Sequence, residues 1–159
     1  MCIRDRVNTF AVEDFIFESK SIEIEKNNNI IAKDGVKVNT SDGLEIFADK
    51  SEYNKNTKIL KLDGSVKIFD KIQNFEINSD KIIYDKNLEK ITSKTKTKII
   101  IDNSHIISGK DIVFFKSKLE IQSNEQSIIE DNFNNLIKLK GFNYSAKTKI
   151  LQTDKMDLI

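Results

Sequence analysis

The sequence contains few of the residues that build covalent cross-links, metal centres and membrane helices. Its 159 residues include one cysteine, one histidine, no proline and no tryptophan. A single cysteine excludes an intrachain disulfide framework and a thiolate metal site. No apolar run approaches the roughly 18–20 residues of a membrane-spanning helix. The chain is long enough to bury a sizeable core, so we expect one domain that is stabilised by packing.

Net charge is also nearly absent. Lysine and arginine together number 26 and aspartate and glutamate number 25, which leaves a formal charge of +1 at pH 7. Proteins that bind nucleic acid usually present a strongly basic face to the phosphates. This balance gives no electrostatic case for a nucleic-acid partner, and we expect none.

The first residues differ in composition from the rest of the chain. Residues 1–6 hold the only cysteine and the only arginines, and every later Lys or Arg is a lysine. We interpret this segment as foreign to the fold. Residues 7–16 fit either the end of a secretory signal, with Ala11 at a small-residue cleavage position, or an ordinary polar N-terminus. The domain itself is expected over residues 17–159, truncated at its C-terminus.

A motif recurs about every thirty residues, and self-similarity at a fixed period decides the architecture. A small residue followed by Asp-Lys begins at Ala48 and at Ser79, and looser versions begin at Ser19 and Gly109. An aromatic residue occupies the same later place in three of these units, at Tyr53, Tyr84 and Phe114. The sequence therefore predicts a repeated structural unit.

Within each unit, apolar and polar residues alternate, as in residues 21–25, 35–39 and 65–70. Successive side chains of a strand face opposite sides, so this period of two predicts half-buried strands joined by polar turns. The fold class is all-β, and a barrel, a sandwich or a solenoid would each bury one face of every strand. The motif at Thr153-Asp154-Lys155 comes one and a half periods after Gly109, which indicates a change of register near the end.

The residues predicted to line a shared apolar interior come from the inward positions of these strands. They are Ile24, Val36, Val38, Ile46, Tyr53, Leu60, Leu62, Val66, Ile68, Phe75, Ile77, Tyr84, Ile99, Ile101 and Phe114. Two interpretations fit the same residues. They could form a closed core packed against itself, or an open groove that holds an apolar ligand.

The sequence gives little support for an enzyme. His105 lacks a second histidine or a later cysteine with which to share a metal, so a structural role is favoured. The acids Asp49, Asp80, Asp111 and Asp154 recur one per unit beside lysine, whereas calcium sites gather several oxygens in one short loop. Phosphate loops, nucleophile elbows and zinc signatures are missing. We expect no catalytic residue, no metal and no cofactor.

The repeat resembles the organic-solvent-tolerance-like (OstA-like) domain of the lipopolysaccharide transport and assembly family. The residues that carry the resemblance are Ala48-Asp49-Lys50 with Tyr53, Leu62-x-Gly64-x-Val66-x-Ile68, and Ser79-Asp80-Lys81 with Tyr84. The resemblance implies an antiparallel β-jellyroll, folded over like a taco, built from hairpin repeats. It also implies a non-catalytic, lipid-binding module whose apolar groove shields the acyl chains of lipopolysaccharide in the periplasm of a Gram-negative cell.

The resemblance implies partners as well. These are the lipid A acyl chains of lipopolysaccharide, other OstA-like domains joined end to end by strand pairing, and an outer-membrane barrel with its lipoprotein plug. The chain is most similar to the N-terminal periplasmic domain of the outer-membrane LPS-assembly protein, which a missing C-terminal barrel would tether to the outer membrane. Two alternatives stay open: the small standalone periplasmic bridge protein of the same family, and a β-solenoid surface or structural protein.

Overall fold

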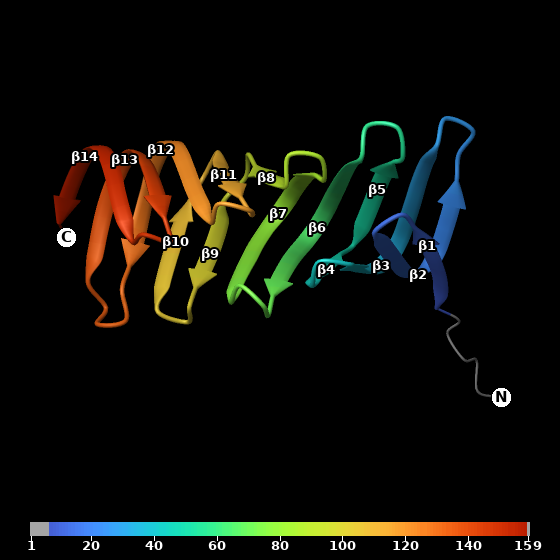
Figure 1. Cartoon of the computed structure of the whole chain (residues 1–159), viewed down its shortest axis with the longest axis horizontal. Coiled ribbons are helices and arrows are strands. Elements are labelled where there is room, and N and C mark those ends of the chain that lie inside the picture. The colour runs from blue at the N-terminus through green and yellow to red at the C-terminus, as the bar shows by residue number, and fades with distance from the viewer. Residues whose placement is uncertain (1–6, 159) are drawn as a thin grey trace.

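The computed structural model describes residues 7–158, so the segment 1–6 that we interpret as foreign lies outside the described residues. These residues form fourteen strands in a single antiparallel sheet (Figure 1). The strands are β1 (Asn8–Val12), β2 (Phe15–Ile24), β3 (Asn29–Thr40), β4 (Leu44–Ala48), β5 (Lys50–Asn54), β6 (Ile59–Asp70), β7 (Phe75–Asp85), β8 (Lys90–Ser93), β9 (Thr97–Ile101), β10 (His105–Gly109), β11 (Ile112–Phe115), β12 (Glu120–Glu130), β13 (Leu136–Ser145) and β14 (Ile150–Leu158). The all-β prediction is confirmed. Across this described part, no helix is long and apolar enough to span a membrane.

The sheet folds over because its strands bend in the middle. One end of β3 pairs with β4 and the other end with β5, while β7 pairs with β9 at one end and β8 at the other. The first half-sheet contains β1, β4, β9, β10 and the ends of longer strands that pair with them. The second half-sheet contains β5, β8, β11 and the opposite ends. Strand pairings are antiparallel throughout residues 7–158, whereas a β-helix stacks parallel coils, so the solenoid alternative is wrong.

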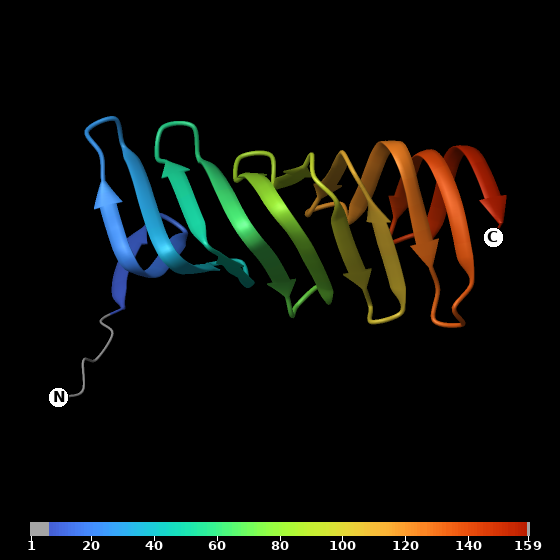
Figure 2. The same ribbon diagram turned by 180° about the vertical axis from the view of Figure 1, so that it is seen from behind.

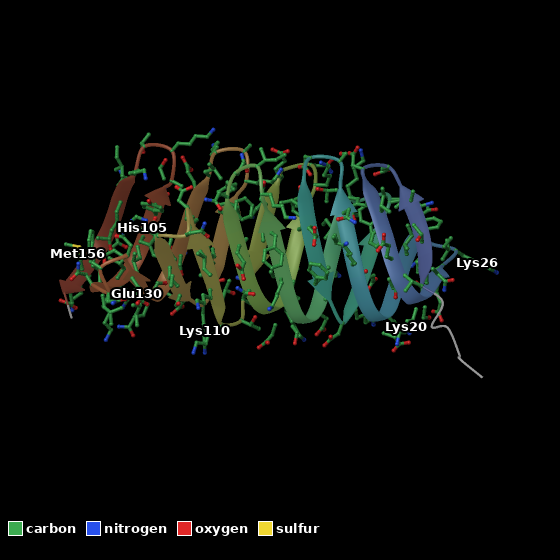
Figure 3. All side chains as sticks on the ribbon, turned by 90° about the horizontal axis from the view of Figure 1, so that it is seen from below. Lys20, Lys26, His105, Lys110, Glu130 and Met156 are labelled. Carbon is green, nitrogen blue, oxygen red and sulfur yellow. The ribbon has the colours of Figure 1, made fainter. Side chains whose placement is uncertain are left out.

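The bends lie along one side of the molecule, which we call the corner line. Lys20 and Lys110 lie on it (Figure 3), and so does Asp49, which separates β4 from β5. The Asp49 N–H donates to the carbonyls of both Asp63 and Gly64, at 3.1 and 2.9 Å. A bend of this kind leaves an extra residue in the ladder, as in a β-bulge. The repeated small-Asp-Lys motif therefore marks the corners of the sheet.

The corner positions also explain the change of register that the sequence indicates. Each bent strand runs from one half-sheet into the other and contains one corner, so a corner occurs about every fifteen residues. The thirty-residue unit therefore contains two bent strands. The interval from Gly109 to Thr153 is three strands long. At the intervening corners, Asn124-Glu125 and Gly141 replace the motif, and β12, β13 and β14 continue the same ladder. The stack is continuous across the apparent irregularity.

The sheet begins before the predicted start of the domain at residue 17. Strand β1 pairs with the first part of β2, from Asn8 opposite Ser19 to Val12 opposite Phe15. Phe10 and Val12 pack against the core, and Phe15 is buried with 1 % of its surface exposed. Residues 8–16 thus form part of the first half-sheet.

Candidate functional site

The inner face of the first half-sheet is a row of isoleucines in cross-strand register. Each member lies directly opposite the next, and the side chains share one face because every second residue of a strand points the same way. The row runs Ile46, Ile68, Ile77, Ile99, Ile107, Ile129 and Ile137. One line of positions along this wall is therefore occupied by the same apolar residue, with larger rings such as Phe15 and Phe75 beside it.

The inner face of the second half-sheet is a row in which aromatic and aliphatic residues alternate. Ile30, Tyr53, Leu60, Tyr84, Ile91, Phe114, Ile121 and Tyr144 lie opposite one another in successive strands. The sequence predicts that Tyr53, Tyr84 and Phe114 occupy equivalent places. They occupy them because the aromatic positions of this row lie on every second strand. Tyr144, on β13, is the next member of that series.

The inner faces of the two half-sheets face each other and are in contact beside these rows. Phe15 of the first half-sheet packs on Tyr53 of the second, with 4.8 Å between ring centroids. Phe75 and Phe114 meet edge to face at 4.7 Å, a favourable geometry for aromatic pairs. The interior is thus occupied by the protein's own side chains at these points. A ligand that occupied these points would have to displace those rings or separate the two half-sheets.

The burial of the predicted interior residues matches the period-two pattern, with one exception. Apart from Ile24, each of the fifteen is at most 5 % exposed. Ile24 is 59 % exposed, so its predicted place in the interior is wrong. In the alternation along β2, Ile24 falls on the side that faces the interior. However, β1 pairs only with the Phe15–Ser19 part of β2, and Ile24 lies at the end of the strand that β1 does not cover. Whether the other fourteen bind a lipid stays a prediction.

Several interior residues were missed by the sequence analysis. Phe15, Phe17, Ile107, Ile121 and Tyr144 are buried in the same core. The alternation Phe15-x-Phe17 is a usable signal, but Phe15 lies in the segment 7–16, which also fits the end of a secretory signal. Ile107, Ile121 and Tyr144 lie beyond the regular motifs, and only the fifteen-residue spacing of the corners shows their equivalence to the earlier strands.

The tyrosines of the second row have hydroxyl groups whose pKa is raised. The Tyr53 hydroxyl donates to the Glu13 carboxylate at 2.7 Å. Burial, that hydrogen bond and the Glu13 charge raise the pKa of Tyr53 well above its ordinary value. The pKa of Tyr84 is also raised well above its ordinary value, mainly by burial and then by the charge of Asp42. Burial likewise raises the pKa of Tyr144.

These shifts predict loss of stability at alkaline pH. Below about pH 10 the phenols are protonated in both folded and unfolded chains, so they contribute no pH dependence. Above it, the unfolded chain releases phenolic protons that the folded chain retains, and stability falls by about 1.4 kcal/mol per pH unit for each tyrosine. We expect near-ultraviolet phenolate absorbance to rise in one step together with loss of the β-sheet circular dichroism. A smooth titration centred near pH 10 with an intact sheet would contradict this.

The remaining candidate residues do not assemble a reactive site. His105 shares a 2.8 Å hydrogen bond with Ser104, and its ring lies 6.5 Å from that of Tyr144. The recurring aspartates occupy separate corners of the sheet. In the described range 7–158, no three acidic, histidine or cysteine side chains gather closely enough to hold a metal ion.

Comparison with models of known protein families gives a match. A family model described as OstA-like protein matches residues 10–134, which is most of the chain. The matched segment runs from within β1 past the end of β12, and the remaining strands β13 and β14 extend the same sheet. No curated protein matches the chain.

Proposed function

The chain belongs to the family of OstA-like proteins, and from that premise we propose that it is a non-catalytic module that binds lipopolysaccharide in the periplasm and shields its acyl chains during transport to the outer membrane. The observation that supports this proposal is the continuous apolar interior between the isoleucine row and the aromatic row. Each methylene group transferred from water to such a surface gains roughly 0.8 kcal/mol. Binding then needs no reaction and no cofactor, only an apolar surface of sufficient length.

The ends of the stack support the proposed partners. The N-terminal strands and β14 lie at opposite ends of the molecule (Figure 2). Within the described residues, β14 pairs with β13 alone, and the Ser21–Ile24 part of β2 pairs with β3 alone. Unpaired strand edges are templates for a further strand, so other OstA-like domains would join end to end and extend the interior.

We further propose that this module functions as the N-terminal periplasmic domain of an LPS-assembly protein, with the standalone bridge protein as the alternative. The similarity of the chain to that N-terminal domain supports this choice. The genomic sequence downstream of codon 159 tests it. Several hundred further codons of amphipathic strands would support the assembly protein, whereas an immediate stop codon would contradict it.

Site-specific photocrosslinking tests lipid binding directly. Benzoylphenylalanine at Ile68, which is fully buried, should crosslink labelled lipopolysaccharide, and the same group at the exposed neighbour Lys67 should crosslink little. Phe114 and Phe115 offer a second matched pair, because both are phenylalanines and only Phe114 points inward. Circular dichroism would verify that each variant is folded. Equal labelling at the inward and outward positions would contradict an interior lipid site.

A further inference from the structure

The turns that join the strands form two rims opposite the corner line. The first rim contains turns 13–14, 41–43, 71–74, 102–104 and 131–135, and the second contains turns 25–28, 55–58, 86–89, 116–119 and 146–149. Three successive turns of the second rim begin with a lysine: Lys55, Lys86 and Lys116. The N–H of each donates to a carbonyl in the preceding turn of the same rim, at Asn28, Lys58 and Glu89 respectively. The backbone thus sets these lysines at a regular spacing.

One carboxylate of the first rim contacts two of these lysines. The Asp42 Oδ2 lies 2.6 Å from the Lys116 Nζ and 3.7 Å from the Lys86 Nζ. The Lys86 Nζ is also 3.9 Å from the Asp14 Oδ2, in the neighbouring turn of the first rim. Asp42 and Lys116 are separated by 74 positions in the sequence, so the contact is made by the folding of one half-sheet onto the other.

The pair is held in place and largely withdrawn from water. The Lys116 side chain is only 8 % exposed and that of Asp42 is 25 % exposed, and lysine is rarely buried to this extent unless it is paired. The Thr40 hydroxyl donates to the Asp42 carboxylate and accepts the Leu44 N–H at 2.9 Å. Burial acts to raise the pKa of Asp42, but the hydrogen bonds from Lys116 and Thr40 and the lysine charges outweigh it and lower that pKa. Asp42 therefore remains a carboxylate at neutral pH.

The rims are the side through which the half-sheets can separate. Along the corner line the two half-sheets are joined by the continuous bent strands, whereas the rims approach each other through side chains. Because facing interior rings touch, a chain-like ligand that enters from this side must first move the rims apart. That movement separates Asp42 from Lys116 and Lys86.

We propose that Asp42, Lys86 and Lys116 form a latch that keeps the two rims together and limits access of the lipid to the interior. This inference rests on the proposed lipid-binding function for its purpose. The latch is an intramolecular contact that competes with the ligand. Its strength adds to that of the ring packing between the half-sheets in limiting how often the interior is accessible.

Amide hydrogen exchange of the ligand-free chain tests the latch without reference to lipid. Asp42→Asn keeps the shape of the side chain and removes its charge, and Lys116→Met removes the cation without adding a buried charge. Each should speed exchange of the amides in turns 41–43 and 116–119 by roughly tenfold, the factor expected when one charge-assisted hydrogen bond is lost. The double variant should show less than the product of the two factors, because both changes remove the same contact.

Asp63→Asn is the matched control, because Asp63 pairs with Lys81 at 3.7 Å on the exposed outer face and both side chains are more than half exposed. An exposed pair of this kind contributes little, so exchange at the rims should match that of the wild-type chain. Rim exchange that is unchanged in both Asp42→Asn and Lys116→Met would overturn the latch. Equal acceleration by Asp63→Asn would also overturn it.

Uptake of a dansyl-labelled undecanoic acid, followed by its fluorescence, tests the control of access. The probe should enter Asp42→Asn several-fold faster than the wild-type chain or Asp63→Asn. Faster rim exchange with unchanged probe uptake would overturn the latch as a control of access. If neither the wild-type chain nor Asp42→Asn bound this probe or lipopolysaccharide, the proposed function would fail, while faster rim exchange would still establish the closing contact.

Discussion

Replacement of Ile68 by aspartate should prevent the chain from folding to its native state. Ile68 is fully buried in the middle of the isoleucine row, opposite both Ile46 and Ile77. An aspartate there would either bury an unpaired charge, which costs several kcal/mol, or take up a proton at a similar cost. Native domains are stable by only about 5–15 kcal/mol, and loss of the isoleucine packing adds to the penalty. Urea unfolding followed by circular dichroism would measure the effect.

Lys67→Asp supplies the control, since it introduces the same residue one position away. Lys67 is exposed on the outer face and its neighbours across the ladder are Phe47 and Asn78. A surface substitution of this kind usually changes stability by less than about 0.5 kcal/mol. If Ile68→Asp folded as stably as Lys67→Asp, the assignment of the inner and outer faces would be wrong.

Gly64→Ala should destabilise the chain by clearly more than Gly35→Ala. Both glycines lie at corners with nearly the same left-handed backbone, at φ values of +84° and +85°. Alanine at either position should cost about 1–2 kcal/mol, because a Cβ disfavours that conformation. At Gly64 the added Cβ would also lie 2.2 Å from the Asp49 Oδ2 and 2.7 Å from the Asp49 Cβ, whereas nothing lies within 4 Å at Gly35. We expect this overlap to add roughly 1–3 kcal/mol.

The difference between the two alanine variants isolates the contact at the corner. Chemical denaturation of both variants under the same conditions gives the two free energies of unfolding. Equal destabilisation would mean that the close approach of Gly64 and Asp49 has no energetic consequence. Greater destabilisation at Gly35 would contradict the packing described for the corner line.

The sequence predicts much of this fold because the strands follow a simple rule. Alternation of apolar and polar residues assigns Ile68 inward and Lys67 outward without any knowledge of neighbours, since that property belongs to the backbone. The recurrence of Tyr53, Tyr84 and Phe114 likewise predicts a shared face. The same rule placed Ile24 inward, and it failed there because burial depends on whether another strand covers the position.

The rim cluster could not be predicted from the sequence. Lys86 and Lys116 stand in polar turns among many other lysines, and Asp42 lies in a turn that also contains Ser41 and Gly43. The two half-sheets are tilted relative to each other, and their relative position determines which turns of the two rims meet. No local sequence pattern encodes that relative position. The closed packing of Phe75 on Phe114 has the same origin, because the two residues come from different half-sheets.

The uniformity of the isoleucine row has a consequence for motion along the stack. Neighbouring strands lie about 4.8 Å apart. Under the proposed function, a hydrocarbon tail that moved along this row would meet an isoleucine on each successive strand of this wall, while the facing row alternates aromatic and aliphatic residues. We expect such a wall to suit a chain that moves along it, in contrast to a pocket whose varied contours hold one molecule still.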